Sequence, residues 1–116
     1  MNITALKDLI IDLKETALLY GESLEIGSAK TANEASSHAI SLKKNIVSKG
    51  VNGISALLKL LEDNDPWVRY AAASLSLDID PERAFVVLQT LQSEPKALGA
   101  AAYTVLRMWE TGVPRD

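Results

Sequence analysis

Acids, an arginine and two aromatic residues lie within the nine positions from residue 62 to residue 70. Glu62, Asp63 and Asp65 come before Trp67, and an arginine and a tyrosine follow it. Carboxylates, a guanidinium and aromatic rings hold charged and apolar groups through ion pairs, hydrogen bonds and ring contacts. No nucleophile paired with a base lies in this segment, so its chemistry favours binding over catalysis.

The rest of the chain offers little for catalysis or metal binding. His38 is the only histidine and there are no cysteines, so a zinc site, a disulfide and a catalytic triad are not indicated. The two serines before His38 lack the setting of a nucleophile elbow. Asp63-Asn64-Asp65 has the spacing of a calcium loop, but the required glycine and final glutamate do not follow. We expect no enzyme activity, no cofactor and no metal.

Three aromatic residues are candidates for contact with a partner. Trp67 follows a turn proline, and exposed tryptophan is favoured at interface hot spots. The alternative is that its ring packs against the connector after the first helix or against a neighbouring hairpin. Tyr70 and Tyr103 lie off the apolar stripes of their helices, so we expect both to be at least partly exposed and to share a surface. With Asp63 and Asp65 they form the predicted partner-binding set.

The acids around positions 62–65 and 78–82 have two interpretations. Both groups flank helix starts, where carboxylates are favourable because of the helix dipole. The alternative is an acidic surface for a basic partner. Arg69 is expected to bond the carboxylates of Asp63 and Asp65 and so tie repeats together, the alternative being an arginine presented to an anion.

Composition and charge narrow the class of protein. The net charge is −3, and the excess of acids lies in residues 51–116, whereas residues 1–50 are neutral. A nucleic-acid binder needs a basic face, and only Lys43, Lys44 and Lys49 cluster here. No apolar stretch approaches the roughly 18 residues of a membrane span, and charges interrupt the amino-terminal segment before it reaches signal-peptide length. We expect a cytoplasmic protein that does not enter a membrane.

Apolar residues recur at three- and four-residue steps, which predicts helices along the whole chain. The first is expected over residues 3–20 with Asn2 or Thr4 as its cap. Gly21 is expected to end it, a polar connector to cover 21–30, and the second helix to cover 31–49. Four further helices are expected to begin at or just after Gly53, Pro66, Pro81 and Glu94-Pro95. Asp65 and Asp80 are the expected N-caps of the helices that begin at Pro66 and Pro81.

The last four helices repeat with a period near 29 residues. Pro66 and Pro95 are 29 apart, and so are the alanine triplets at 71–73 and 100–102. Two copies are too few to establish a solenoid from self-similarity alone. The first helix pair, over residues 1–50, is expected to act as the cap that such stacks need.

Leu57–Leu75 resembles a HEAT repeat, since it contains Leu-Leu-x-x-Leu, an acidic turn, Pro-x-Val-Arg and paired alanines. The match is looser over Phe85–Leu106, where Ala97-Leu98 replaces the valine-arginine pair. The whole chain is similar to a family of small, functionally uncharacterised bacterial HEAT-like domains. The features that carry this resemblance are the valine-arginine block, Leu106-Arg107-Met108-Trp109 and Gly112. The resemblance implies a short right-handed α-solenoid.

We therefore expect one all-α domain over residues 1–116. Its six helices should form three antiparallel hairpins, stacked as a short right-handed HEAT-like α-solenoid. Residues 1–50 would be the capping pair, 51–79 the HEAT-like repeat and 80–112 the second repeat.

The expected function is a protein-binding module. Small acidic helical proteins of this kind resemble immunity proteins of bacterial competition systems, so the concrete expectation is a monomer that neutralises a cognate toxin, with a basic toxin domain as its partner. Acidic turns would steer association, and Trp67 and Tyr70 would anchor it. Two alternatives stay open: a helical-repeat nucleic-acid-binding protein, and a self-associating scaffold.

Overall fold

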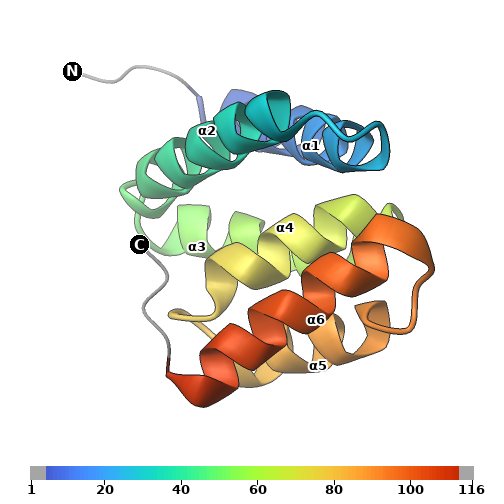
Figure 1. Cartoon of the computed structure of the whole chain (residues 1–116). Helices are drawn as coiled ribbons and strands as arrows, with labels where there is room; N and C mark the ends of the chain where they lie inside the picture. The colour runs from blue at the N-terminus through green and yellow to red at the C-terminus, as the bar shows by residue number, and fades with distance from the viewer. Residues whose placement is uncertain (1–4, 113–116) are drawn as a thin grey trace.

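The computed structural model describes residues 5–112, and over that range the chain is all-α, as predicted (Figure 1). Six α-helices and one 3-10 turn follow one another within those residues. They are α1 Leu6–Glu25, α2 Ala29–Val47, α3 Val51–Lys59, η1 Leu60–Glu62, α4 Pro66–Ser76, α5 Pro81–Leu91 and α6 Lys96–Thr111. The predicted cap residues Asn2 and Thr4 lie outside the described range.

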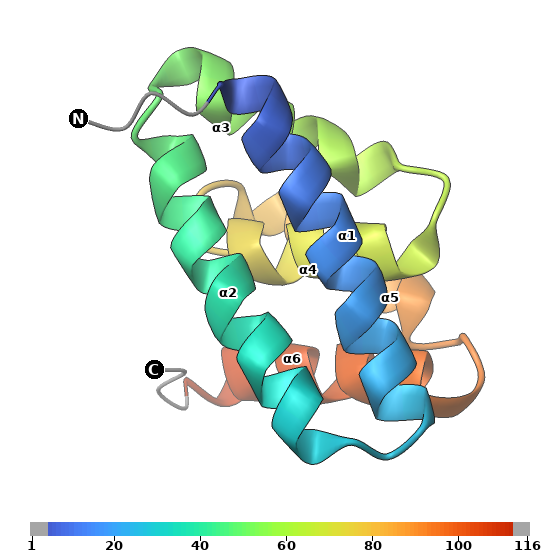
Figure 2. The same ribbon diagram turned by 90° about the horizontal axis from the view of Figure 1, so that it is seen from above.

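Consecutive helices pack as hairpins, and the hairpins lie on one another in layers (Figures 1 and 2). The pair α1–α2 covers one side of α3 and α4, and the pair α5–α6 packs against the other side of α4. Figure 2 shows α1 and α2 side by side above α4 and α6. Helix α4 contacts every other helix, so it is the centre of the fold.

The turn of the first hairpin differs from the prediction. Helix α1 continues past Gly21 to Glu25, and the connector is only Ile26–Ser28. Gly27, with φ of 78°, has the left-handed conformation that favours glycine beyond a helix end. Gly21 therefore does not end the helix, and its role lies in packing.

The starts of α4 and α5 follow the predicted capping chemistry. Asp65 Oδ1 accepts hydrogen bonds from the backbone N–H groups of Trp67 and Val68 at 2.8 and 3.3 Å. Asp80 accepts one from Arg83 at 3.4 Å, and a proline stands in the first turn of each helix. These carboxylates satisfy donors that a helix start leaves without a partner, so the two predicted N-caps are confirmed.

The core is built from leucine and alanine contributed by all six helices. The largest fully buried apolar side chains are Leu13, Ile46, Leu57, Val68, Leu88 and Leu91. Helix α4 contributes Ala72 and Ala73, both 0% exposed. Because these side chains are small, the surrounding helices can approach the central helix closely.

Candidate functional site

Trp67 lies in an aromatic cluster between α1 and α4, formed with Tyr20 and Tyr70. The Trp67 ring makes edge contacts with Tyr20 and Tyr70, with centroids 5.9 and 5.6 Å apart. The two tyrosine rings stack on each other at 5.9 Å. Trp67 is only partly exposed, so the structure favours the alternative in which its ring packs against the first hairpin.

The prediction that Tyr70 is partly exposed is wrong, since it is 8% exposed. Helix α4 is surrounded, so positions away from its predicted stripe also meet neighbouring helices. Burial raises the pKa of the Tyr70 phenol above its ordinary value of 10, the adjacent Tyr20 phenol adds to this, and the Ser74 hydroxyl opposes it. Tyr70 is therefore neutral near pH 7 and keeps its hydroxyl proton for hydrogen bonding.

Gly21 provides the space that the Trp67 ring occupies. A Cβ at Gly21 would lie 2.5 to 2.6 Å from three atoms of that ring. We expect Gly21→Ala to lower the free energy of unfolding by about 1–2 kcal/mol, because the ring would have to move. Helix propensity alone would change it by about 1 kcal/mol in the opposite direction.

Urea denaturation measures the sign of the Gly21→Ala effect. A double-mutant cycle with Trp67→Leu is the control, because a smaller side chain opposite the new methyl group should remove most of the penalty. A Gly21→Ala variant as stable as the wild type or more so would show that the ring does not occupy this space.

Asp63 and Asp65 have structural partners within the chain. Asp65 caps α4, and the Asp63 carboxylate accepts a hydrogen bond from the Asp65 backbone N–H at 3.0 Å and pairs with Lys14 at 3.2 Å. Burial raises the pKa of the Asp63 carboxyl, but the Asp65 N–H and the Lys14 ammonium together hold it below its ordinary value of 3.8. The Asp63 carboxylate therefore fixes the turn to α1.

Arg69 binds the same turn, but not through carboxylates as predicted. Its Nη1 donates to the backbone carbonyls of Asp63 and Asn64 at 2.7 and 3.1 Å. Backbone carbonyls in a turn have no helical partner, so the guanidinium satisfies them. Arg69 thus holds its own turn through carbonyl oxygens, and these bonds do not join one repeat to another as predicted.

The second group of acids is also paired within the chain. Asp78 accepts from Lys43 Nζ at 2.7 and 2.9 Å, which joins α2 to the end of α4. Arg83 lies 3.4 Å from Glu62 and 3.8 Å from Asp80. These pairs are partly exposed and each adds little stability. These ion pairs favour a structural role for the acids over the alternative of an unpaired acidic surface for a basic partner.

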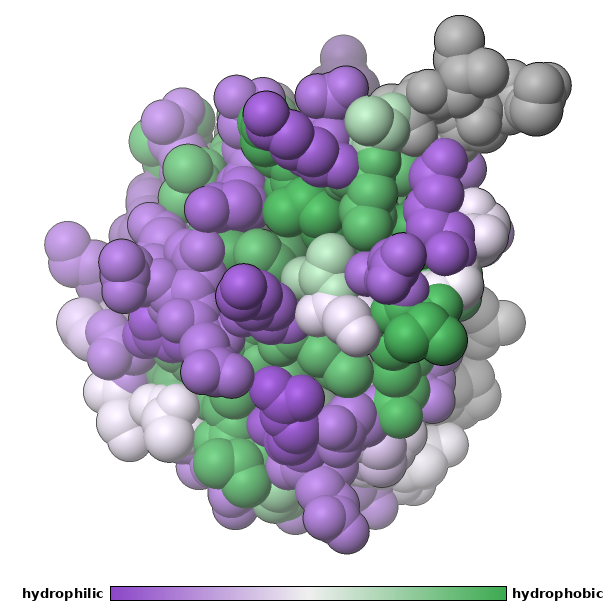
Figure 3. Space-filling model, turned by 180° about the vertical axis from the view of Figure 1, so that it is seen from behind, coloured by the Kyte–Doolittle hydropathy of each residue, from purple (hydrophilic) through white to green (hydrophobic). Residues whose placement is uncertain are grey.

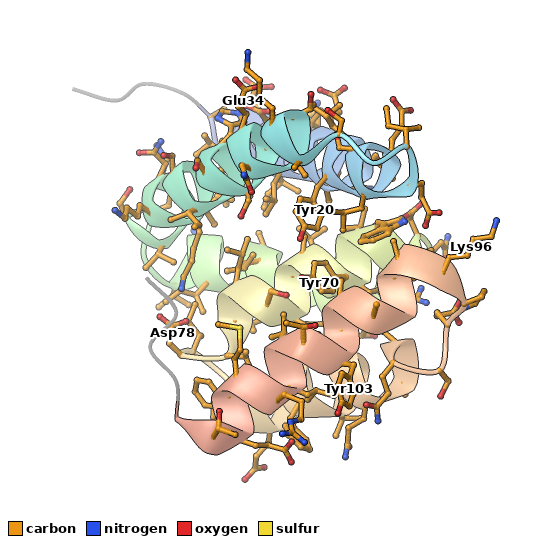
Figure 4. All side chains as sticks on the ribbon, in the orientation of Figure 1. Tyr20, Glu34, Tyr70, Asp78, Lys96 and Tyr103 are labelled. Atoms are coloured by element: carbon orange, nitrogen blue, oxygen red, sulfur yellow. The ribbon has the colours of Figure 1, made fainter. Side chains whose placement is uncertain are left out.

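Tyr103 does not share a surface with Tyr70. It is 52% exposed and lies on the side of α6 away from the first hairpin, as Figure 4 shows. The Arg107 guanidinium lies 6.0 Å above its ring. The five residues of the predicted set are thus divided between a buried aromatic cluster, a structural turn and a separate face.

A groove that the sequence did not predict lies between the first hairpin and helices α4 and α6. Its volume is about 350 Å³. Its walls are mainly apolar and include Ala17, Ala35, Ala39, Ile40, Ala71, Leu75, Val105 and Met108. The related signal in the sequence is a row of small residues on α2. Ala32 and Ala35 are each 3% exposed where α2 packs against its neighbours, and Ala35 and Ala39 also line the groove.

The two ends of the groove carry polar side chains. Tyr20 and Tyr70 of the aromatic cluster line one end, and Figure 4 shows both between the first hairpin and α4. Lys43, held by Asp78, lines the other end. Ser74 is also among the lining residues, but its hydroxyl oxygen is buried beneath the groove surface, beside the Tyr70 hydroxyl.

Outside the groove, one pair of titratable side chains has the residue types of a catalytic dyad. His38 Nε2 lies 3.1 Å from Asp12 Oδ2, and both side chains are about half exposed. Within residues 5–112, no three histidine, cysteine, aspartate or glutamate side chains gather as a metal site would require. In the same part of the chain, no helix has the length and apolarity to span a membrane.

Comparisons of the chain with protein-family models, with curated proteins and with solved structures find no match. The resemblance of Leu57–Leu75 to a HEAT repeat therefore stays a prediction. The division into a capping pair and two repeats also stays a prediction. What the described residues establish is an all-α fold of packed helical hairpins with an apolar groove between the first hairpin, α4 and α6.

Proposed function

We propose that this chain is a protein-binding module that receives part of its partner in the groove. The groove itself carries the proposal, since concave, mainly apolar sites with a few placed polar groups are where proteins bind ligands. Ile40 at its edge is 48% exposed, so apolar surface continues from the groove onto the rim. A partner protein would cover both surfaces.

The lining supports binding rather than catalysis. Its titratable side chains are Lys43, which is paired with Asp78, and two tyrosines. The lining has hydroxyl groups but no histidine or carboxylate that would activate them as nucleophiles. Shape and apolar contact are what this lining offers to a partner.

The more specific form of the proposal is a monomeric immunity protein related to bacterial HEAT-like domains, with a basic toxin domain as partner. The net charge of −3 supports a basic partner, and the stacked hairpins and the 29-residue period support the HEAT-like relationship. The absence of cysteine suits a reducing compartment, so the proposal includes a cytoplasmic location.

Self-association is a second candidate, favoured by apolar side chains on the outer face of α1. Ile11, Leu18 and Leu19 are between 45% and 46% exposed. On the face shown in Figure 3, apolar and polar side chains are interleaved rather than separated. Light scattering over a range of concentrations tests this candidate, and a stable monomer would contradict it.

Two adjacent serines give a matched test of the groove. Ser36 lines the groove and Ser37 does not, although both are exposed on α2. We expect Ser36→Trp to weaken capture of the partner from a host lysate at least about tenfold, because the indole would lie across the groove. Ser37→Trp should capture it as the wild type does.

The readout is the concentration of bait at half-maximal capture, with circular dichroism to establish that both variants fold. Equal capture by the two variants would exclude the groove as the partner's site. No capture by the wild type at any bait concentration would count against a protein partner altogether.

A further inference from the structure

The buried residues of the first hairpin differ between its two ends. Near the link to α3 they are large and belong to the main core: Leu9, Leu13, Leu42 and Ile46. Near the Ile26–Ser28 turn the buried residues include Gly21 of α1, and Ala32 and Ala35 of α2, which lie outside that core. Burial of leucine and isoleucine stabilises packing more than burial of alanine. The end of the hairpin at the link is therefore anchored more firmly than the end at the turn.

Contacts between the first hairpin and the helices below it are sparse. Helices α1 and α2 contact each other along most of their length, but they contact α4 and α6 at far fewer places. The groove of about 350 Å³ lies in between. Across it, the Tyr20 ring meets Trp67 and Tyr70 at one end, and Lys43 pairs with Asp78 at the other. Low contact density is a property of the parts of a fold that open at the lowest free energy.

The link between α2 and α3 has the features of a hinge. It consists of Ser48, Lys49 and Gly50, and Gly50 has φ of 77°, a conformation that glycine adopts without steric cost. Apart from its chain neighbours, no described atom lies within 4 Å of the position that a Cβ of Gly50 would take. Hinges are a few residues at the ends of elements that absorb a change of φ and ψ. A rotation about this link moves the distant turn of the hairpin most and the anchored end least.

We propose that the first hairpin is a lid on the groove, which rotates about the link at 48–50 and lifts its Ile26–Ser28 turn away from α4 and α6. The contacts of Tyr20 with Trp67 and Tyr70 hold the lid down. Lifting it widens the groove and exposes the face of α4 that lies beneath the hairpin, which admits a partner to that face. The inference rests on the proposed function for the use of the lid, but the motion itself is measured without a partner.

Ser74→Cys reports opening of the lid, because the wild-type chain has no cysteine. The Ser74 hydroxyl oxygen has under 1 Å² of accessible area and lies on the α4 face beneath the first hairpin, beside the Tyr70 hydroxyl. A thiol in its place would react with a reagent such as DTNB only after the hairpin has lifted. The reaction rate gives the opening equilibrium, and its dependence on urea gives the amount of surface exposed.

Ser76→Cys is the matched control on the same helix. The Ser76 hydroxyl oxygen is equally buried, but two residues further along an α-helix it points about 200° away from Ser74, and it does not line the groove. We expect Ser74→Cys to react at least about tenfold faster than Ser76→Cys and with a smaller urea dependence, because lifting the lid exposes less surface than unfolding the chain. Equal rates with equal urea dependence would overturn the inference.

Amide hydrogen exchange separates a lid from local unfolding of the hairpin. The amides of Gly21 and Ala35 lie within α1 and α2 near the turn end, so they stay hydrogen-bonded when the hairpin lifts as a unit. We expect their opening constants in the wild type to be at least about tenfold below that from Ser74→Cys and to match global unfolding. Opening constants equal to that of Ser74→Cys would mean that the helices themselves unfold, which would exclude a lid. The proposed function has its own separate readout, the comparison of Ser36→Trp with Ser37→Trp.

Discussion

Trp67→Ala is expected to lower the free energy of unfolding by about 3 kcal/mol. The indole fills the space between Tyr20, Tyr70 and Gly21, and its removal leaves a cavity lined by two rings. A domain of this size has a total stability of about 5–15 kcal/mol, so the loss is a substantial part of it. If Trp67 were an exposed partner anchor, as one interpretation of the sequence holds, this variant would keep its stability and lose its partner.

Urea denaturation with an unchanged m-value measures the Trp67→Ala effect. Tyr103→Ala is the control, because Tyr103 is an aromatic residue that is 52% exposed, and its removal should change stability by less than about 0.5 kcal/mol. If the two variants lose similar small amounts, the Trp67 ring is not part of the packed cluster, and its role as a partner anchor is restored.

Local chemistry was predictable from the sequence. Asp65 before Pro66 and Asp80 before Pro81 mark helix starts because a cap and a proline act within three residues of themselves. The all-α fold followed from apolar periodicity in the same way. These predictions were right because none of them depends on how the helices are placed relative to one another.

Tertiary placement was not predictable, and the candidate site depends on it. Tyr70 is off the stripe of α4, yet it is buried because α4 has neighbours on several sides. Glycine is common at helix ends, and only the position of Trp67 shows that Gly21 instead leaves room for the indole ring. Ala35 and Ala39 suit either close helix contact or an open groove. The stacking of the helix layers decides between these two outcomes, so the spacing of residues in the sequence could not reveal the groove.

Gly53→Ala is expected to lower the free energy of unfolding by about 3 kcal/mol or more. The Asn52-Gly53 pair has the residue types of a turn, but Gly53 lies buried in the first turn of α3. A Cβ there would overlap the carbonyl oxygen of Ile46, in the last turn of α2, and would lie 3.1 Å from Lys49 Cβ. Since the overlap is with backbone, no rotamer change relieves it, and α2 would have to move away from α3.

The sign of the effect makes Gly53→Ala a sharp test, because glycine to alanine in an open helix stabilises by about 1 kcal/mol. Asn52→Ala is the matched control, since Asn52 is the exposed neighbour in the same helix and should stay within about 0.7 kcal/mol of the wild type, on the stabilising side. Thermal or urea unfolding of the two variants gives the comparison. If Gly53→Ala were as stable as Asn52→Ala or more stable, α2 and α3 would be further apart than described. The position of the first hairpin, which forms one wall of the groove, would then also be wrong.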